Sequence, residues 1–326
     1  MSKLVTIYGG SGFVGRYIAR RMAKAGWRVR VAVRRPNEAM FVKTYGAVGQ
    51  VEPVLCNVRD DASVAAVMQG ADAVVNCVGI LTETRRNKFD AVQHEAAERV
   101  ARIAADQGVK SLVHLSSIGA STEAESEYSR TKGLGEAGIL KHFPSATILR
   151  PSVIFGSEDE FVNKFASMSR LGPVMAIVGG DTTFQPVHVD DVAEAVEVAL
   201  NKNLSGVYEL GGPEVLSLRA IVGKILECAH RRRIVLNLPF FVGSILGGVF
   251  GLLQALTLGM FHNSILTRDQ VKSLKHDNVV DAGAKGFADL GIKPTSLDAV
   301  IPSYVWRYRP SGQYDDIRDS AKNIKA

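Results

Sequence analysis

The sequence predicts an α/β fold: a doubly wound parallel sheet with helices on both faces, followed by a smaller, mostly helical C-terminal region. Short apolar runs alternate with helical stretches over the first 150 residues, and a repeat of glycines joins the first run to the first helical stretch. The regular alternation stops after Pro151. Strands that alternate with helices are joined by right-handed crossovers, which produce a parallel sheet covered on both faces.

Apolar runs with the length of strands occur throughout the first half of the chain. They are residues 3–8, 28–33, 51–55, 73–77, 112–115 and 147–149. Helical periodicity covers residues 13–25, 89–107 and 127–142 between them. We therefore expect residues 1–150 to form the first domain.

The second half predicts a smaller domain over residues 151–326, some segments of which return to the sheet. A helix is expected over residues 160–170. A second helix should run to about Leu200, with Asp190 and Asp191 capping its first turn through their carboxylates.

Composition excludes several classes of protein. The chain has 326 residues, 46% hydrophobic and 22% charged, as in ordinary globular proteins. Its net charge of +6 is not concentrated in a helix that could read DNA, so we expect no nucleic-acid partner.

The three cysteines, Cys56, Cys77 and Cys228, have neither the spacing of a disulfide scaffold nor that of metal ligands. We therefore expect no metal site and a reducing compartment. The N-terminus has no pattern of a signal or transit peptide, and we expect the protein to stay where it is made.

A glycine-rich loop follows the first predicted strand and opens the first helix. Its repeat is Gly9, Gly12 and Gly15. Glycines in this context allow a tight turn, close approach of a pyrophosphate to the backbone, and close packing of the helix on the sheet. The helix N-terminus adds free N–H groups and a positive dipole end. We therefore predict that a dinucleotide binds here, with Ser11, Phe13 and Val14 also in contact.

The second strand ends in Arg34 and Arg35, where a cofactor with a free ribose 2′-hydroxyl usually meets an acidic residue. A guanidinium pairs with a phosphate through two hydrogen bonds. The arginines therefore favour NADP(H) over NAD(H). The alternative is a basic turn in solvent.

Residues after the later strands complete the predicted cofactor site. Parallel strands end at one edge of the sheet, and the ligand crevice lies outside those ends. We expect Asn57 and Val58 to border the adenine and Cys77, Val78 and Gly79 to line the middle of the cofactor.

Ser116 and Ser117 end the fifth strand, and Tyr128 and Lys132 follow on the next predicted helix. Positions i and i+4 share a helix face. An ammonium group beside a phenol favours the phenolate, which suits a general acid/base, and Ser117 can hold a substrate oxygen. The alternatives are a solvated helix face or a pair that only anchors the cofactor.

Residues 234–267 contain no Asp, Glu, Lys or Arg, and three arginines, Arg231 to Arg233, precede them. Pro239 and several glycines make one continuous helix costly. We expect residues 231–267 to contact an anionic lipid surface or a partner. A buried helix pair and a membrane span are the alternatives.

These features together resemble the short-chain dehydrogenase/reductase superfamily, in its extended or atypical branch. The resemblance runs through the glycine loop, Ser117, the Tyr128–Lys132 pair, and residues 150–156 and 185–192. The last two stretches border the substrate cleft in that branch, and we expect Pro151 and Ile154 to contact the cofactor. Gln93, Val78 and the short gap between Ser117 and Tyr128 depart from the pattern, which weakens the case for catalysis and leaves cofactor binding intact.

A narrower group is also similar, the dehydrogenase-like accessory subunits of respiratory complex I (alpha subcomplex subunit nine in mitochondria). The residues that carry this resemblance are 165–168, 170, 172–173, 266–269 and 290–292. This resemblance implies a non-catalytic, NADPH-binding subunit that stabilises the junction of the hydrophilic and membrane arms of NADH:ubiquinone oxidoreductase. Its partners would be other subunits of the complex, and Ser117, Tyr128 and Lys132 would be vestigial.

The implied location is the cytoplasmic face of a bacterial inner membrane, held peripherally, or the matrix side of the inner membrane if the protein is mitochondrial. A second interpretation is a soluble NADP-dependent oxidoreductase or epimerase that acts on a nucleotide-sugar or a similar small substrate. The uncharged segment favours the first.

Overall fold

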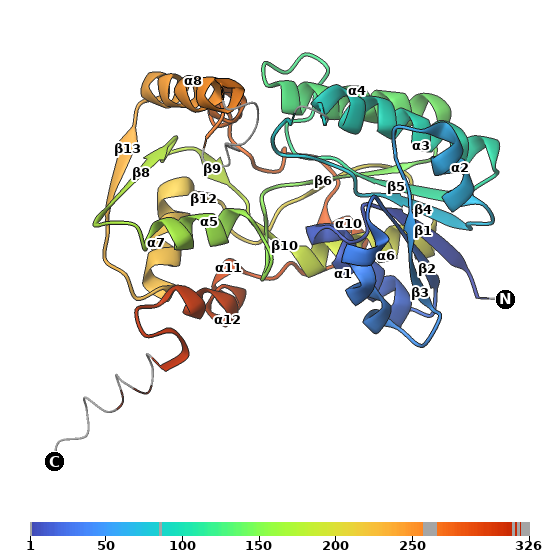
Figure 1. The fold of residues 1–326 in the computed structure, drawn as a ribbon, viewed down its shortest axis with the longest axis horizontal. Coiled ribbons are helices and arrows are strands. Elements are labelled where there is room, and N and C mark those ends of the chain that lie inside the picture. Colours follow the sequence, from blue (N-terminus) through green and yellow to red (C-terminus); the bar gives the residue numbers. More distant parts are fainter. Residues whose placement is uncertain (1, 85–86, 257–265, 315–316, 318–319, 321–326) are drawn as a thin grey trace.

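The computed structural model describes residues 2–84, 87–256, 266–314, 317 and 320, and its centre is a seven-stranded parallel sheet (Figure 1). The strand order is β11-β6-β5-β4-β1-β2-β3. These strands are β1 (Leu4–Tyr8), β2 (Arg28–Val33), β3 (Val51–Leu55), β4 (Ala73–Asn76), β5 (Ser111–Leu115), β6 (Thr147–Pro151) and β11 (Gly206–Leu210). Successive strands are added outward from β1 on one side, as β2 and β3, and from β4 on the other side, as β5 and β6. The strand order therefore switches between β1 and β4, which pair in parallel, and the predicted doubly wound α/β fold is confirmed.

Helices cover both faces of this sheet. One face packs against α1 (Phe13–Lys24), α6 (Val189–Lys202) and α10 (Phe287–Leu290). The other packs against α2 (Asp61–Met68), α3 (Glu95–Asp106) and α4 (Glu127–His142). The central strands are buried on both sides, which explains why they are continuous apolar runs in the sequence.

The predicted helix over 89–107 is not one regular helix. It begins as a π-helix, η2 (Asp90–His94), and continues as α3. A Cβ on Gly135 of α4 would collide with the backbone carbonyl oxygen of Gln93. Because Gly135 has no Cβ, α4 can approach this turn closely. Single π-helical turns are frequent at functional sites. This one directs Gln93 into the interior, where the residue is 1% exposed.

A second lobe lies beside the sheet (Figure 1). It comprises residues 153–184, 213–256, 266–280 and 293–314, and its core joins Phe155, Leu218 and Tyr304. Its main elements are β8 (Val174–Val178) paired with β13 (Ile234–Leu238), α5 (Phe161–Met168), α7 (Leu218–Cys228), α8 (Phe240–Leu256) and α9 (Arg268–Ser273). Its smaller elements are β7 (Ile154–Phe155), which pairs with β10 (Val187–His188), β9 (Thr183–Phe184), which pairs with β12 (Leu216–Ser217), α11 (Leu297–Val300) and α12 (Pro302–Val305).

Asp190 and Asp191 do not cap α6, contrary to expectation. His188 occupies the cap position, and both acids lie in the first helical turn. Asp190 accepts hydrogen bonds from Arg21 of α1, at 3.0 and 2.8 Å, while Asp191 accepts from the backbone N–H of Thr295 at 2.6 Å. The carboxylates are used to join α6 to other segments, a role that local sequence does not reveal.

The uncharged segment divides into a strand and a helix. Pro239 separates β13 from α8, and residues 257–265 lie outside the described residues. Among the helices that the structure describes, none is long and apolar enough to cross a membrane.

The glycines of α8 do not break it, although their number argued against a continuous helix. A Cβ on Gly243 would stand 2.9 Å from the side chain of Val178, and one on Gly247 would stand 2.9 Å from the backbone nitrogen of Arg268. Close packing against β8 and α9 therefore offsets the low helix propensity of these residues.

Candidate dinucleotide site

The loop between β1 and α1 requires its glycines for steric reasons. Gly9 has a φ of +76°, a left-handed conformation that glycine adopts without strain. A Cβ on Gly12 would stand 3.2 Å from the carbonyl oxygen of Gly9, and a Cβ on Gly15 would collide with that same oxygen. The loop and the first turn of α1 therefore pack at a distance that only glycine permits.

The N-terminus of α1 points its free amides at this loop. Gly12 is the cap residue and supplies no side-chain hydrogen bond, so the first-turn N–H groups, those of Phe13, Val14 and Gly15 among them, remain available. Arg16 donates to the carbonyls of Ser11, at 3.2 Å, and Gly12, at 3.3 Å, and so holds the loop from one side. Sequence reasoning missed Arg16, because an arginine in an amphipathic helix looks like a solvated residue.

Arg34 and Arg35 follow β2 at the same edge, and both are exposed. The Arg34 guanidinium donates to the amide oxygen of Asn87 at 3.4 Å, and that of Arg35 to Glu38 at 2.9 Å. Both contacts are at the surface. The guanidinium groups can therefore turn toward an anion at little cost.

The residues after β3 and β4 border the glycine loop. Asn57 and Val58 follow β3, and Cys77 to Gly79 follow β4. A Cβ on Gly9 would stand 3.2 Å from the carbonyl oxygen of Cys77, which places these segments against each other. Burial raises the pKa of the Cys77 thiol to about 12, so it stays protonated and apolar in character.

Lys132 lies deep in the site, 5% exposed, on the inner face of α4. Its ammonium donates to the backbone carbonyl of Leu115 at 2.8 Å. Burial lowers the pKa of this ammonium to about 8, while the nearby Glu136 carboxylate opposes that shift.

Tyr128 lies one turn earlier on α4, half-buried, with its ring edge-on to Phe89 at 5.9 Å between centroids. Burial raises the pKa of its phenol, and the adjacent hydroxyl of Ser117 offsets part of that rise. The structure thus places the hydroxyl of Ser117 beside the phenol of Tyr128. The pKa of the phenol therefore lies above its usual value, and the expected effect of Lys132 on the phenol stays a prediction.

A buried charge network lies beneath this pair. Glu136 of α4 accepts a short hydrogen bond from Ser116 and two from Arg150, at 3.0 and 2.6 Å. Arg150 also donates to Glu209 of β11 at 3.4 Å. Glu136 and Glu209 are 5% and 4% exposed, so their charges depend on this arginine. No local pattern in the sequence indicates these three partners, because each comes from a different element.

Pro151 and Ile154 follow the same edge. Pro151 ends β6 and accepts a hydrogen bond from the backbone N–H of Ile118 at 3.0 Å, while Ile154 begins β7 and packs against the core beside α1 and α6. With them, the predicted cofactor residues all follow the carboxyl ends of the parallel strands or lie on α1 and α4, the helices beside those ends.

These residues fit a bound dinucleotide. The glycine loop packs tightly against the start of α1, and the first-turn amides of α1 have no capping side chain and can meet a phosphate. Ser117 Oγ and Gln93 Oε1 are buried polar atoms that make no hydrogen bond of standard geometry to the described residues. Buried polar atoms without partners are rare in folded proteins, and a ligand beside them would supply the missing partner.

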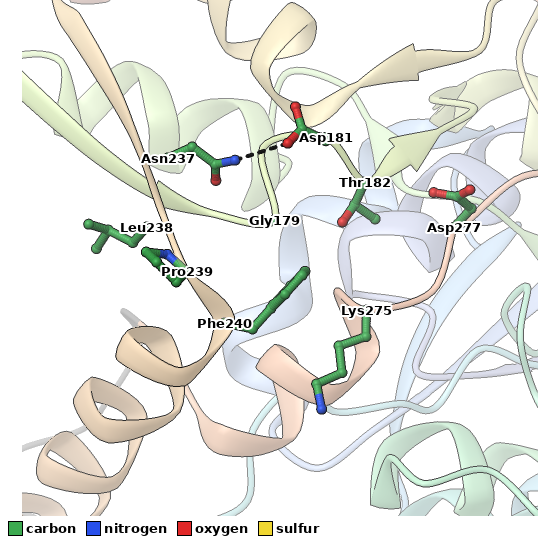
Figure 2. Close-up of a pocket in the computed structure, with 9 residues that line it drawn as sticks. All are labelled: Gly179, Asp181, Thr182, Asn237, Leu238, Pro239, Phe240, Lys275 and Asp277. Carbon is green, nitrogen blue, oxygen red and sulfur yellow. Dashed lines mark hydrogen bonds between the residues drawn. The ribbon is translucent and has the colours of Figure 1, made fainter.

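A separate cavity of about 380 Å³ lies in the second lobe (Figure 2). Its lining residues include Lys275, Asp277 and Phe240, the first residue of α8. The side chain of Asn237 donates to Asp181 at 3.1 Å and accepts from the backbone N–H of Gly180 at 2.9 Å. These two hydrogen bonds hold the end of β13 in place just before α8 begins. None of its lining residues belongs to the predicted dinucleotide site.

Residues 5–211 match the model of the NAD dependent epimerase/dehydratase family. The chain belongs to this family. The match covers every strand of the central sheet and the whole candidate site, and it supports a nicotinamide dinucleotide as the cofactor of this epimerase/dehydratase fold.

Two curated relatives match nearly the whole chain. NADH dehydrogenase [ubiquinone] 1 alpha subcomplex subunit 9, mitochondrial, of Arabidopsis thaliana is 31% identical over 316 residues, which cover 95% of this chain and 79% of that protein. The NADH-ubiquinone oxidoreductase 40 kDa subunit, mitochondrial, of Neurospora crassa is 32% identical over 312 residues, covering 95% and 80%. The predicted resemblance to complex I subunits within the short-chain dehydrogenase/reductase group is therefore confirmed.

A solved structure shows the same fold. The Bordetella bronchiseptica enzyme WbmG in complex with NAD has a TM-score of 0.66 and 14% identity, covering 97% of this chain and 95% of that one. At this identity the likeness extends to the fold alone.

Proposed function

We propose that this member of the epimerase/dehydratase family is a non-catalytic accessory subunit of respiratory complex I that binds NADPH and stabilises the junction of the hydrophilic and membrane arms. The observation that carries the proposal is the extent of the similarity. The family model ends at residue 211, whereas the similarity to the complex I subunits continues over 95% of the chain. The second lobe is thus shared with those subunits as well as the cofactor domain.

The positions of Arg34 and Arg35 support NADPH in particular. Both follow β2, at the strand end where the adenosine ribose of a dinucleotide lies in this fold. Two exposed guanidinium groups and no carboxylate at 34–35 suit a 2′-phosphate. When bound, NADPH can supply a hydride. We propose that this protein binds NADPH without transferring that hydride to a substrate.

The state of the Tyr128–Lys132 pair supports the absence of turnover. Burial raises the pKa of the phenol, and the ammonium of Lys132 is already engaged with the carbonyl of Leu115. A proton donor for carbonyl reduction works best with a pKa near the working pH. Here Lys132 and Tyr128 act instead as parts of the wall against which the cofactor would be held.

An exposed apolar face on the second lobe supports docking to a membrane-arm partner or to anionic lipid. Phe241, Ile245 and Val249 of α8 are 67%, 60% and 49% exposed. Their spacing of four residues places them on one side of the helix. Ile234 and Leu236 of β13 are also exposed, and Figure 1 shows α8 and β13 at the outer edge of this lobe. We call Phe241, Ile245 and Val249, with these two strand residues, the α8 face.

Two of the arginines before β13 are tied to backbone carbonyls. Arg231 donates to the carbonyl of Tyr308 at 2.8 Å and Arg233 to that of Ser169 at 2.7 Å. Both are half-buried, and Arg232 is exposed. The three arginines keep their positive charge, so the proposed docking combines this charge with the apolar side chains of the α8 face. Attachment would be peripheral, on the cytoplasmic side of a bacterial inner membrane or on the matrix side in a mitochondrion.

Fractionation of membranes followed by native gels and mass spectrometry tests the proposal. The chain should sediment with membranes and migrate with complex I. A strain without the gene should lose assembled complex, and the Tyr128→Phe variant should restore it fully. A chain found only in the soluble fraction, with NADPH-dependent carbonyl or nucleotide-sugar turnover that Tyr128→Phe abolishes, would instead identify an enzyme.

A further inference from the structure

Residues 266–269 form a motif that cofactor binding does not explain, and the structure gives Asp269 a specific contact. Its carboxylate accepts three hydrogen bonds from the start of α4. The donors are the hydroxyl of Ser126 at 2.8 Å, the backbone N–H of Glu127 at 2.7 Å and the backbone N–H of Tyr128 at 3.1 Å. A residue of the second lobe thus binds the first turn of the helix that carries Tyr128 and Lys132.

This contact supplies what the end of α4 lacks. The first N–H groups of a helix have no partner within the helix, and a negative charge beside them is stabilised by the helix dipole. Ser126 caps α4 from within, accepting from the N–H of Ser129 at 3.5 Å, a long contact. Asp269 satisfies the N–H groups of Glu127 and Tyr128 from outside. Ser273 of α9 adds a second tie, donating to the Ser126 hydroxyl at 2.9 Å.

The same short helix is fixed to α8. A Cβ on Gly247 would stand 2.9 Å from the backbone nitrogen of Arg268 and 3.0 Å from the carbonyl carbon of Thr267. The two backbones therefore pack with no side chain between them. A capping box between Thr267 and Gln270 makes α9 rigid at this end. A displacement of α8 would therefore act on the backbone next to Asp269.

We infer that Asp269 is a positioning residue that couples the α8 face to the dinucleotide site. It holds the first turn of α4, and with it Tyr128, in the position that a bound nicotinamide dinucleotide requires. The coupling rests on the proposed docking of the α8 face. If docking orders α8 and α9, it strengthens dinucleotide binding, and binding strengthens docking by the same factor.

Hydrogen exchange tests the role of Asp269 without any docking partner. In Asp269→Ala, the amides of Glu127 and Tyr128 should exchange about 10- to 100-fold faster, because two hydrogen bonds to a charged acceptor are lost. Affinity for NADPH, measured by calorimetry, should fall about tenfold. The reason is that part of the binding free energy is then needed to order the first turn of α4. Asp269→Asn keeps one acceptor oxygen and should recover part of both effects.

Asp277→Ala is the matched control. Asp277 lies on the same stretch of the second lobe and accepts from the backbone N–H of Thr183 at 2.7 Å. It caps no part of α4, so both measurements should equal those of the wild type. Unchanged exchange of the Glu127 and Tyr128 amides in Asp269→Ala would overturn the inference, as would equal effects of the two variants.

Binding to membranes tests the coupling. Salt-washed membranes from cells that lack the chain are titrated with purified wild type and Asp269→Ala, each with and without NADPH. NADPH should tighten sedimentation of the wild type about 5-fold or more, and that difference should vanish in Asp269→Ala. If the wild type sediments with membranes equally well with and without NADPH, the coupling is disproved. A wild type that does not sediment at all would contradict the proposed docking instead, and the exchange experiment would still decide what Asp269 does.

Discussion

Arg34 and Arg35 carry the choice of cofactor, and their double replacement tests it. Loss of one charge-assisted hydrogen bond costs about 1.5–3 kcal/mol, or about 10- to 150-fold in affinity. Arg34→Ala with Arg35→Ala should therefore weaken NADPH binding by at least this factor and leave NADH binding nearly unchanged. Arg28→Ala, an exposed arginine at the opposite end of the same strand, is the control. An equal loss for the two cofactors would contradict the assignment.

Lys132 makes stability depend on pH in a defined direction. Its pKa falls from 10.5 to about 8 on burial. Between these values the unfolded chain keeps the proton and the folded chain releases it, so this residue makes the folded state more stable as pH rises. Its penalty is complete below about pH 8 and absent above about 10.5.

The measurement compares urea unfolding of the wild type and Lys132→Met at the two ends of this window. The free energy of unfolding of the wild type should rise relative to the variant, by up to about 1.4 kcal/mol per pH unit. Lys110→Met, at an exposed lysine, should follow the wild type. A wild type and a Lys132→Met variant with parallel pH profiles would show that Lys132 does not titrate in this range.

Residue-level reasoning from the sequence succeeded where chemistry is local. The spacing of Gly9, Gly12 and Gly15 and that of Tyr128 and Lys132 indicate a turn and a helix face, and the structure contains both. It failed for Glu136 and Asp269. Their roles depend on Arg150 and on the first turn of α4, partners that only the tertiary fold brings close.

At the scale of elements, strands β1 to β6 begin and end within one or two residues of the predicted limits, because buried parallel strands are continuous apolar runs. The α8 region was harder to predict. Pro239 and the glycines indicated a broken segment, whereas packing against β8 and α9 allows a helix of 17 residues. Tertiary contacts there outweigh local propensity.

The exposed side of α8 gives a prediction of its own. Ile245→Glu with Val249→Glu should release the protein from membranes or from its complex. Each buried apolar side chain contributes about 1.5–3 kcal/mol, so losing two weakens docking roughly 100-fold or more. The dinucleotide domain should still fold, because neither side chain is in its core.

Control substitutions show whether added charge alone matters. Val48→Glu with Val215→Glu changes two exposed apolar residues that lie outside α8. This pair should sediment with membranes like the wild type. If the α8 double variant also stays in the pellet after a high-salt wash, the docking face has been placed wrongly.

At the scale of the whole molecule, the two parts of the chain are interleaved. The chain leaves the central sheet after β6, returns as α6 and β11, leaves again, and returns a second time as α10. Phe287, Leu290 and Ile292 are 6%, 2% and 7% exposed in the core beside α1 and α6. We therefore predict that the boundary near residue 150 marks a change of pattern and not the end of a unit that folds alone.

A chain that ends at residue 211 should fail to fold cooperatively. Three missing core side chains remove about 5–9 kcal/mol of burial, comparable to the total stability of a typical domain. Thermal unfolding followed by near-UV circular dichroism should show no sharp transition, while a chain that ends at Tyr314 should retain one. A cooperative transition in residues 1–211 would show that the family-matched region is an independent domain.

The return of α10 to the sheet sets an order of events during synthesis. The ribosome releases the chain from its N-terminus, so β1 to β6 and α1 emerge long before residue 287. Until Ile292 has left the exit tunnel, part of the apolar surface on α1 and α6 has nothing to cover it. The nascent protein therefore presents a binding surface for chaperones through much of its translation, and it loses that surface only when the last part of its core is made.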